Sequence, residues 1–145
     1  MGYNNISMFF KTLLFSLLII ADCYHLLPMW WNIGKVAEFN KNKNNKLIFN
    51  NEQLILYNDG IKWLAINDIC PHRGASLSHG KFDKKTKCII CPYHGWEFNE
   101  GNLVKIPGQY ENNIASIASK NNLNLKKYKI KELNNYLYIY LHEKI

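Results

Sequence analysis

From Trp31 onward, hydrophobic and polar residues follow one another in short runs that are typical of β-strands rather than helices. Turn-forming residues separate the runs, and the pairs Asp59-Gly60 and Asn134-Asn135 are strong hairpin signals. Residues 107–125 are polar and irregular and predict at most one helical turn, near residues 114–119. The expected strands span residues 31–39, 53–58, 61–67, 87–91, 96–99, 103–106, 126–133 and 136–141. The pattern predicts an all-β domain.

The last of these runs shows the clearest alternation. Tyrosines at positions 136, 138 and 140 alternate with Leu137, Ile139 and Leu141. Because successive side chains of a strand point to opposite faces, we expect the aliphatic residues to face the core and the tyrosines to form an amphipathic surface.

The first 27 residues follow a different pattern. Residues 8–21 (MFFKTLLFSLLIIA) are strongly apolar, but they contain Lys11 and fall short of the roughly 20 residues that a spanning helix needs. No small-residue cleavage site follows, because Asp22 and Cys23 come next. We therefore divide the chain into a hydrophobic leader or helix, residues 1–27, and a domain, residues 28–145. The leader either targets the chain to a membrane or packs on the domain, and the sequence leaves its localisation unknown.

Composition adds charge to this picture. The chain has 145 residues and a formal net charge of +7, much of it in Asn/Lys-rich stretches such as residues 40–46 (NKNKNNK), which we expect to be solvated loops. A basic protein suits acidic partners, anionic membranes or nucleic acid. The chain has no basic stripe interleaved with aromatic residues, so we expect no nucleic-acid partner.

The candidate chemistry lies in two Cys/His pairs of unequal spacing, Cys70-Pro-His72 and Cys91-Pro-Tyr-His94, both in loops between expected strands. Zinc sites usually place two or more residues between paired ligands, so the first pair is awkward for zinc. A cysteine nucleophile with a histidine base would use one pair and leave the other unexplained. Both remain alternatives, but neither accounts for all four residues.

An iron–sulfur cluster does account for them. Thiolates are soft donors suited to iron that carries bridging sulfides, and imidazoles also suit iron. Two thiolates on one iron and two imidazoles on the other make a Rieske-type [2Fe–2S] cluster. Pro71 and Pro92 would stiffen the loops by fixing φ, and Gly74 and Gly95 would permit tight turns that aim backbone N–H groups at the sulfurs.

The segments CPHRGASLSHG and CPYHGWEF resemble the Rieske domain of Rieske-type oxygenases, in the branch that contains pheophorbide a oxygenase, chlorophyllide a oxygenase and vanillate demethylase. The Trp-Trp pair at 30–31, Lys-Ile-Pro at 105–107 and the closing KKYKIKELNNYLYIYL extend the resemblance over residues 28–141. The resemblance implies three small antiparallel sheets, with one cluster at the tip of two loops. It also implies that Cys70 and Cys91 bind one iron, and that His72 and His94 bind the exposed iron.

The same resemblance implies a role in one-electron transfer between redox partner proteins, a reductase and an acceptor, with His94 nearest the acceptor. Arg73 and Tyr93 stand where the cytochrome-type Rieske proteins carry disulfide cysteines, and Trp96 replaces their serine. Without that serine hydroxyl near a sulfur, we expect a reduction potential at the low end of the Rieske range, about −150 mV. We expect Trp96 to shield the cluster rather than to relay electrons.

The family's oxygenases continue into a catalytic domain with a mononuclear iron, and no facial triad can be assembled from the histidines of this chain. We therefore expect a ferredoxin-like or oxygenase-associated redox component rather than a complete oxygenase. A split oxygenase with the mononuclear iron on another chain, and a redox-sensing interaction module, are the alternatives. Five further cysteines and histidines are expected to be structural or surface residues: Cys23, His25, His79, Cys88 and His142.

Overall fold

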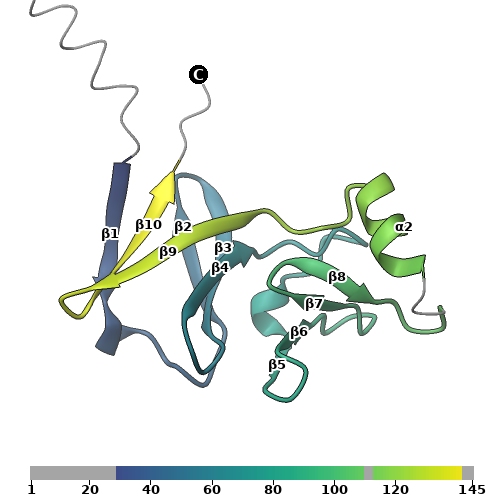
Figure 1. The fold of residues 1–145 in the computed structure, drawn as a ribbon, viewed down its shortest axis with the longest axis horizontal. Helices are drawn as coiled ribbons and strands as arrows, with labels where there is room; N and C mark the ends of the chain where they lie inside the picture. Colours follow the sequence, from purple (N-terminus) through teal and green to yellow (C-terminus); the bar gives the residue numbers. More distant parts are fainter. Residues whose placement is uncertain (1–28, 110–112, 142–145) are drawn as a thin grey trace, which may run out of the picture. The chain divides into compact units, whose positions relative to one another are not determined.

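The computed structural model describes residues 29–109 and 113–141 (Figure 1). The leader, residues 1–27, lies outside the described residues, as does His142. Residues Trp30–Tyr140 form one compact unit. Within the described parts of the chain, no helix is long and apolar enough to cross a membrane.

The first sheet has six strands in the order β1-β10-β9-β4-β3-β2 (Figure 1). The pairs β2–β3, β3–β4, β4–β9 and β9–β10 are antiparallel. Its strands are β1 (Met29–Lys35), β2 (Asn45–Phe49), β3 (Glu52–Asn58), β4 (Trp63–Asn67), β9 (Lys127–Leu133) and β10 (Tyr136–Leu141). The expected all-β architecture is confirmed, with one short helix added.

Strand β9 explains why the structure has two sheets where the resemblance implied three. Tyr128, near the start of β9, pairs with Ala65 of β4. Residues 129–133 of the same strand pair with β10. Because one strand belongs to both ladders, the two smaller sheets that it joins are continuous.

The second sheet has four strands in sequential order, β5-β6-β7-β8, and each neighbouring pair is antiparallel. The helix α2 (Ile114–Lys120) contacts β8 (Figure 1). It has seven residues, so it is longer than the single turn expected near residues 114–119. The strands are β5 (Lys81–Asp83), β6 (Cys88–Ile90), β7 (Glu97–Asn99) and β8 (Asn102–Lys105), and the 3-10 turn η2 (Leu77–His79) precedes β5.

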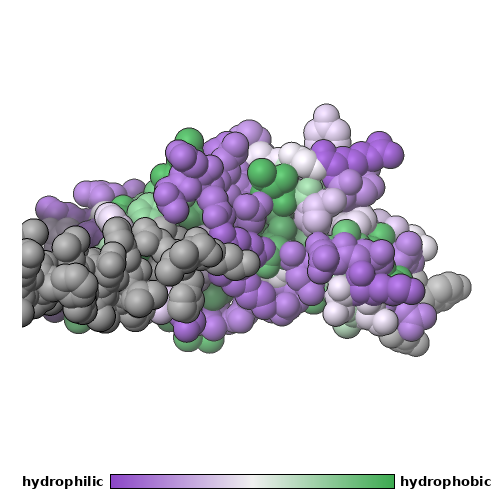
Figure 2. Space-filling model, turned by 90° about the horizontal axis from the view of Figure 1, so that it is seen from above, coloured by the Kyte–Doolittle hydropathy of each residue, from purple (hydrophilic) through white to green (hydrophobic). Residues whose placement is uncertain are grey.

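One hydrophobic core takes side chains from both sheets and from α2. Ile55 and Ile66 of the first sheet, Ile89 and Phe98 of the second, and Ala118 of α2 all belong to it. Cys70 and Cys91 are members of the same cluster. The two cysteines of the motif are therefore part of the packed interior. Most of the described surface that faces the viewer in Figure 2 is hydrophilic, with smaller hydrophobic areas between.

The C-terminal hairpin confirms the alternation predicted from its sequence. Leu137 and Ile139 are fully buried, and Tyr136, Tyr138 and Tyr140 are half-buried on the opposite face. The burial of the aliphatic face fixes the register of the strand, because a slip of one residue would place the tyrosines in the core.

Two predictions about the N-terminal part of the first sheet were wrong. Residues 36–38 form a 3-10 turn, η1 (Val36–Glu38), instead of continuing the first strand, and the Glu38 carboxylate accepts a hydrogen bond from the Lys35 N–H at 3.0 Å. The Asn/Lys-rich stretch runs into strand β2, which sequence analysis missed. Asn45 begins this strand, and its side-chain amide donates to the Leu56 carbonyl of β3 at 3.0 Å. Asparagine thus contributes to sheet pairing in a segment whose composition predicts a loop.

Candidate metal centre

Two loops of the same backbone form carry the Cys/His pairs. The first follows β4, where the Cys70 N–H donates to the Ala75 carbonyl at 2.8 Å and the Gly74 N–H donates to the Cys70 carbonyl at 2.9 Å. The second follows β6, where the Cys91 N–H donates to the Trp96 carbonyl at 2.8 Å, and the glycine at 95 donates back to Cys91 at 3.1 Å. Each hydrogen bond in one loop has a counterpart in the other.

The correspondence is a constant shift of 21 positions, from 70 to 91, 74 to 95 and 75 to 96. The bridge between Ile69 and Ser76 at the base of the first loop matches the pairing of Ile90 with Glu97 at the base of the second. The two loops are therefore a structural repeat. The shared Cys-Pro and Gly of CPHRG and CPYHG follow this shift, but the histidines do not, and the sequence analysis compared the loops by their Cys/His spacing.

Both loops turn at a glycine in the left-handed region. Gly74 has φ +74° and Gly95 has φ +68°. A residue with a Cβ rarely adopts this conformation, so the predicted tight turns at these two positions are confirmed. Each turn folds the loop back over its cysteine.

The two cysteine thiols lie side by side in the interior. Cys70 is 1% exposed and Cys91 is 3% exposed, and their side chains are hydrogen-bonded to each other. The pKa of the Cys70 thiol is raised to about 11: burial and the neighbouring Cys91 thiol raise it, and the backbone N–H groups of His72 and Arg73 act in the opposite direction. N–H groups aimed at a sulfur stabilise it as a thiolate, which is the form that binds a metal.

The two histidine rings also meet across the loops. The centroids of His72 and His94 are 4.6 Å apart, with the rings edge to face at 70°. The ring of His72 also stacks on Trp96, at 4.6 Å and 4°. His72 Nδ1 is buried and has no hydrogen-bond partner among the described residues. Burial, and then the neighbouring His94 and Arg73, lower the pKa of His72, which favours the neutral imidazole that a metal requires.

The donor set fits a two-iron cluster. The thiols of Cys70 and Cys91 are adjacent, and so are the imidazoles of the two histidines. Each loop supplies one thiol and one imidazole. Within residues 29–109 and 113–141, no three or more His, Cys, Asp or Glu side chains are arranged around a point that a single metal ion could occupy. The orphaned, buried Nδ1 of His72 is a donor atom that a coordinated metal would satisfy.

A family model describes this arrangement. Residues 29–129 match the model of the Rieske [2Fe-2S] domain. The chain belongs to the Rieske [2Fe-2S] domain family. Members of the family carry one Rieske-type [2Fe–2S] cluster and transfer electrons through it, one at a time.

Relatives of this Rieske domain are larger oxygenases. The chloroplastic pheophorbide a oxygenase of Oryza sativa subsp. japonica is 35% identical over 81 residues, which are 54% of this chain and 15% of that protein. The vanillate O-demethylase oxygenase subunit of a Pseudomonas species is 42% identical over 72 residues, 48% of this chain and 20% of that subunit. The crystal structure of dicamba monooxygenase bound to dicamba matches with a TM-score of 0.63 and 28% identity, over 77% of this chain and 31% of that chain. This chain thus spans less than a third of each relative.

Other residues near the Rieske motif lie as follows. Trp96, which sequence analysis treated as a shielding residue, covers one face of His72. Tyr93 is 76% exposed beside His94, with ring centroids 5.4 Å apart. Arg73 is exposed.

Two buried residues lie close to the motif in sequence. Cys88 is buried in β6, where its thiol donates to the Thr86 carbonyl at 3.3 Å. Asp68, two residues before the first ligand candidate, is a fully buried carboxylate. Sequence analysis missed Asp68, because its burial depends on contacts with residues on other segments.

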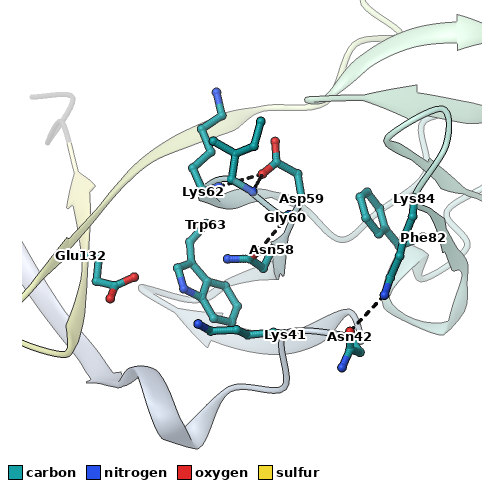
Figure 3. A pocket seen from close by; sticks show the side chains of 11 residues that line it. Lys41, Asn42, Asn58, Asp59, Gly60, Lys62, Trp63, Phe82, Lys84 and Glu132 are labelled. Atoms are coloured by element: carbon teal, nitrogen blue, oxygen red, sulfur yellow. Dashed lines mark hydrogen bonds between the residues drawn. The ribbon is translucent and has the colours of Figure 1, made fainter.

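A separate cleft of about 420 Å³ lies beside the β3–β4 hairpin (Figure 3). Three lysines line it together with Asp59 and Glu132, and Trp63 forms part of its wall with an indole nitrogen that has no partner among the described residues. One of the lysines, Lys62, is paired with Glu100 at 2.9 Å. The turn of this hairpin precedes β4, whereas the first Cys/His loop follows β4, and none of the four motif residues lines the cleft. The cleft is therefore no part of the candidate metal centre.

Proposed function

We propose that Cys70, His72, Cys91 and His94 hold the [2Fe–2S] cluster, with both thiolates on the inner iron and both imidazoles on the outer iron. One observation carries the assignment: the two loops bring like donor next to like donor, so that thiols pair in the core and imidazoles pair nearer the surface. A cluster with one iron per donor type needs this separation.

When bound, the cluster accepts and releases one electron at a time. The protein contributes the environment around it. Burial of Cys70 and Cys91 keeps water from the sulfur side, and Trp96 covers His72. His94 is exposed, so its ring is the part of the ligand set that a partner protein can approach. Electrons would therefore enter and leave through His94.

We propose that this electron transfer serves an oxygenase iron centre that lies outside the Rieske domain. The support comes from the relatives, which are named as oxygenases and of which this chain matches only a part. The redox partners would be a reductase that supplies electrons and the protein or domain that carries the oxygen-activating iron. Copurification of such an iron protein with the full chain is the expected result. Steady reduction and reoxidation with no oxygenase component present would favour a general ferredoxin role instead.

We also propose that residues 1–27 associate the chain with a membrane, and that its partners are proteins rather than nucleic acid. The apolar run at residues 8–21 supports the first part. The full chain should sediment with phosphatidylcholine vesicles, and a variant with Leu18→Asp and Ile19→Asp should remain in the supernatant. Equal sedimentation of both proteins would contradict the proposal.

Paired substitutions test the ligand assignment. Cys91→Ser and His94→Gln each remove one ligand, whereas Cys88→Ser and His79→Gln change the same residue types outside the set. We expect each ligand variant to lose at least about tenfold in bound iron and sulfide per folded protein, because loss of even an outer-shell group costs that much in metal affinity. The two control variants should retain both. Wild-type iron and sulfide contents in Cys91→Ser would refute the assignment.

A further inference from the structure

Asp68 is the one charged side chain that the described residues bury completely. It lies two residues before Cys70, between the end of β4 and the first loop. A buried carboxylate is costly unless several donors stabilise it. The residues around Asp68 must therefore supply those donors.

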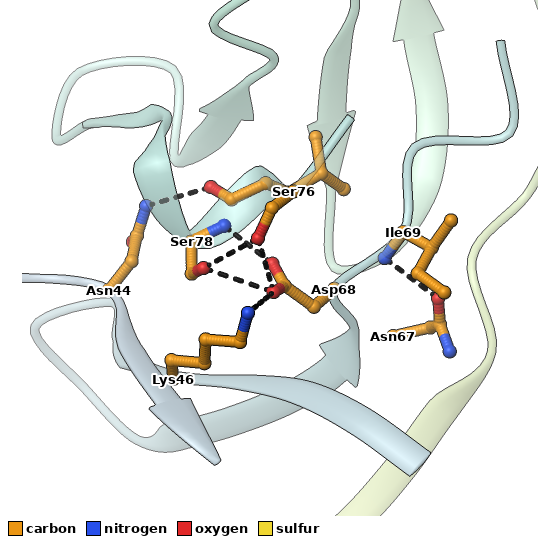
Figure 4. Close-up of polar contacts among 8 residues, drawn as sticks. Asn44, Lys46, Asn67, Asp68, Ile69, Ser76 and Ser78 are labelled. Carbon is orange, nitrogen blue, oxygen red and sulfur yellow. Dashed lines mark hydrogen bonds and ion pairs between the residues drawn. The ribbon is translucent and has the colours of Figure 1, made fainter. Parts of the chain in front are cut away.

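Four contacts surround this carboxylate (Figure 4). Ser76 Oγ donates to it at 2.5 Å, and Ser78 donates through its backbone N–H at 2.6 Å and through its hydroxyl at 3.0 Å. Lys46 Nζ of β2 lies 3.6 Å away. Every partner is a donor, so the side chain acts as an acceptor throughout. Ser76 and Ser78 come from the far side of the first loop, and Asp68 therefore ties the two ends of that loop together.

The second loop is closed without a carboxylate. By the shift of 21 positions, Ile89 corresponds to Asp68, and Ile89 is fully buried in the core. There Ile89 pairs with Phe98 within the regular β6–β7 ladder. The first loop has only the isolated bridge between Ile69 and Ser76 at the same place. Hydrogen bonds that the Asp68 carboxylate accepts thus take the part in the first loop that the further strand pairing takes in the second.

We propose that Asp68 is a positioning residue for the Cys70–His72 loop, and that its buried charge lowers the reduction potential of the cluster. This inference rests on the ligand set proposed above. The Cα of Asp68 is at most about 7 Å from that of Cys70, because two extended residues span no more. Reduction adds a negative charge to the cluster, and a carboxylate fixed nearby in a low-dielectric interior opposes it. Lys46 offsets part of this effect, but its side chain is 43% exposed and is screened by water.

Two substitutions of opposite charge separate this effect from a purely structural one. Asp68→Asn keeps the size of the side chain and removes the negative charge, so it should favour the reduced form by about tenfold, or about 59 mV for a one-electron couple. Lys46→Gln removes the offsetting positive charge without touching the serine contacts, so it should disfavour reduction by about threefold, or about 28 mV.

Lys62→Gln is the matched control, because it changes the net charge equally and removes a lysine that is also paired with a carboxylate, Glu100. Lys62 precedes β4, at the end of the strand away from Cys70. The measurement is the midpoint potential of the full chain, obtained by redox titration followed by electron paramagnetic resonance (EPR), together with the rate of cluster loss. Asp68→Asn should also lose its cluster faster than the wild type, because the amide offers one acceptor oxygen where the carboxylate offers two, so the loop is tied less firmly.

The outcomes are distinct. A higher potential in Asp68→Asn, a lower one in Lys46→Gln and an unchanged one in Lys62→Gln support the proposal. If Asp68→Asn does not fold, the direction of the Lys46→Gln shift decides. Potentials of both variants that match the control overturn the proposal, even where the cluster is lost faster. A wild-type protein without a Rieske EPR signal overturns the ligand assignment first, and this inference with it.

Discussion

Arg73 occupies in the first loop the position that His94 occupies in the second. The shift of 21 positions that relates the two loops also pairs His72 with Tyr93. The unequal spacings of the two Cys/His pairs therefore do not reflect two kinds of loop. One loop form is used twice, and the histidine stands at its third residue in one copy and at its fourth in the other. From these different positions the two rings approach to 4.6 Å.

Because the two rings approach each other from different loop positions, we expect cluster binding to depend on where the histidine stands in its loop. The double variant Tyr93→His with His94→Tyr keeps the composition of the second loop but moves its imidazole to the position equivalent to His72. We expect the variant to fold and to bind at least about tenfold less iron and sulfide, measured per folded protein. Arg73→Gln, which changes the position equivalent to His94 in the first loop, should retain the cluster. Full cluster content in the exchanged variant would show that either position serves.

Alanine should destabilise the fold more at Gly80 than at Gly74, although only Gly74 has a positive φ. Gly74 has φ +74°, but a Cβ there would meet no atom within 4 Å. Gly80 has an ordinary φ of −79°, yet its Cβ would overlap the carbonyl oxygens of Ile90 and Leu77. We expect Gly74→Ala to lower the free energy of unfolding by about 1 kcal/mol and Gly80→Ala by about 3 kcal/mol, measured by urea denaturation. The opposite ranking would mean that the backbone around Gly80 moves freely.

Two buried tyrosines should respond in opposite directions to loss of the hydroxyl. Tyr57 is 1% exposed, and its hydroxyl has no partner among the described residues. Tyr128 is 8% exposed, and its hydroxyl donates to the Glu52 carboxylate. Tyr57→Phe should therefore raise the free energy of unfolding by about 1 kcal/mol, and Tyr128→Phe should lower it by a similar amount. Destabilisation by both substitutions would show that Tyr57 has an acceptor that the described residues do not provide.

Because of Glu52, the free energy of unfolding should fall at acidic pH. The Lys126 ammonium and then the Tyr128 hydroxyl hold the pKa of Glu52 below its ordinary value of 4.5. A carboxyl with a depressed pKa in the folded state contributes stability above its unfolded pKa, and the contribution is lost as pH falls through the folded pKa. The site is partly exposed, so the contribution is about 0.5 kcal/mol.

The test compares urea unfolding at pH 7 and pH 3. Glu52→Gln should lose stability at pH 7 and lose less than the wild type on acidification. Glu132→Gln, which removes an exposed carboxylate from the same sheet, should follow the wild type. An identical response of Glu52→Gln and wild type to acid would rule out this contribution.

Much of the fold followed from alternation of residue types. The C-terminal hairpin was predicted with its core face, because Leu137 and Ile139 are buried strand residues in a clean period of two. Strand β2 was missed because asparagine and lysine have low strand propensity, and the hydrogen bond of Asn45 to Leu56 is a tertiary interaction. The short strand β5 was missed for a related reason, since three residues carry too little pattern to detect.

The candidate site, like the fold, was predicted from the sequence only in part. Cysteine, histidine, proline and glycine are recognised from residue type and spacing, and the four ligand candidates were identified in this manner. The stack of Trp96 on His72 and the contacts of Asp68 join residues on different loops or strands, so spacing alone does not predict them. The repeat of the loops is visible in the shared Cys, Pro and Gly of CPHRG and CPYHG, but the displaced histidine hid it, and the backbone hydrogen bonds were needed to establish the alignment.

Mixed ligation of one cluster by these residues is the central claim, and EPR on the full chain tests it most directly. The protein would be purified without oxygen, labelled with 15N-histidine, reduced with dithionite and measured by continuous-wave and pulsed EPR, with iron and sulfide counted in the same sample. We predict a rhombic signal of low average g, equal iron and acid-labile sulfide, and coupling to the nitrogens of both His72 and His94. The 15N coupling should disappear for one nitrogen in His94→Gln, if that variant retains any cluster. A sample that contains zinc and no iron, or a cluster with no histidine coupling, would contradict mixed ligation.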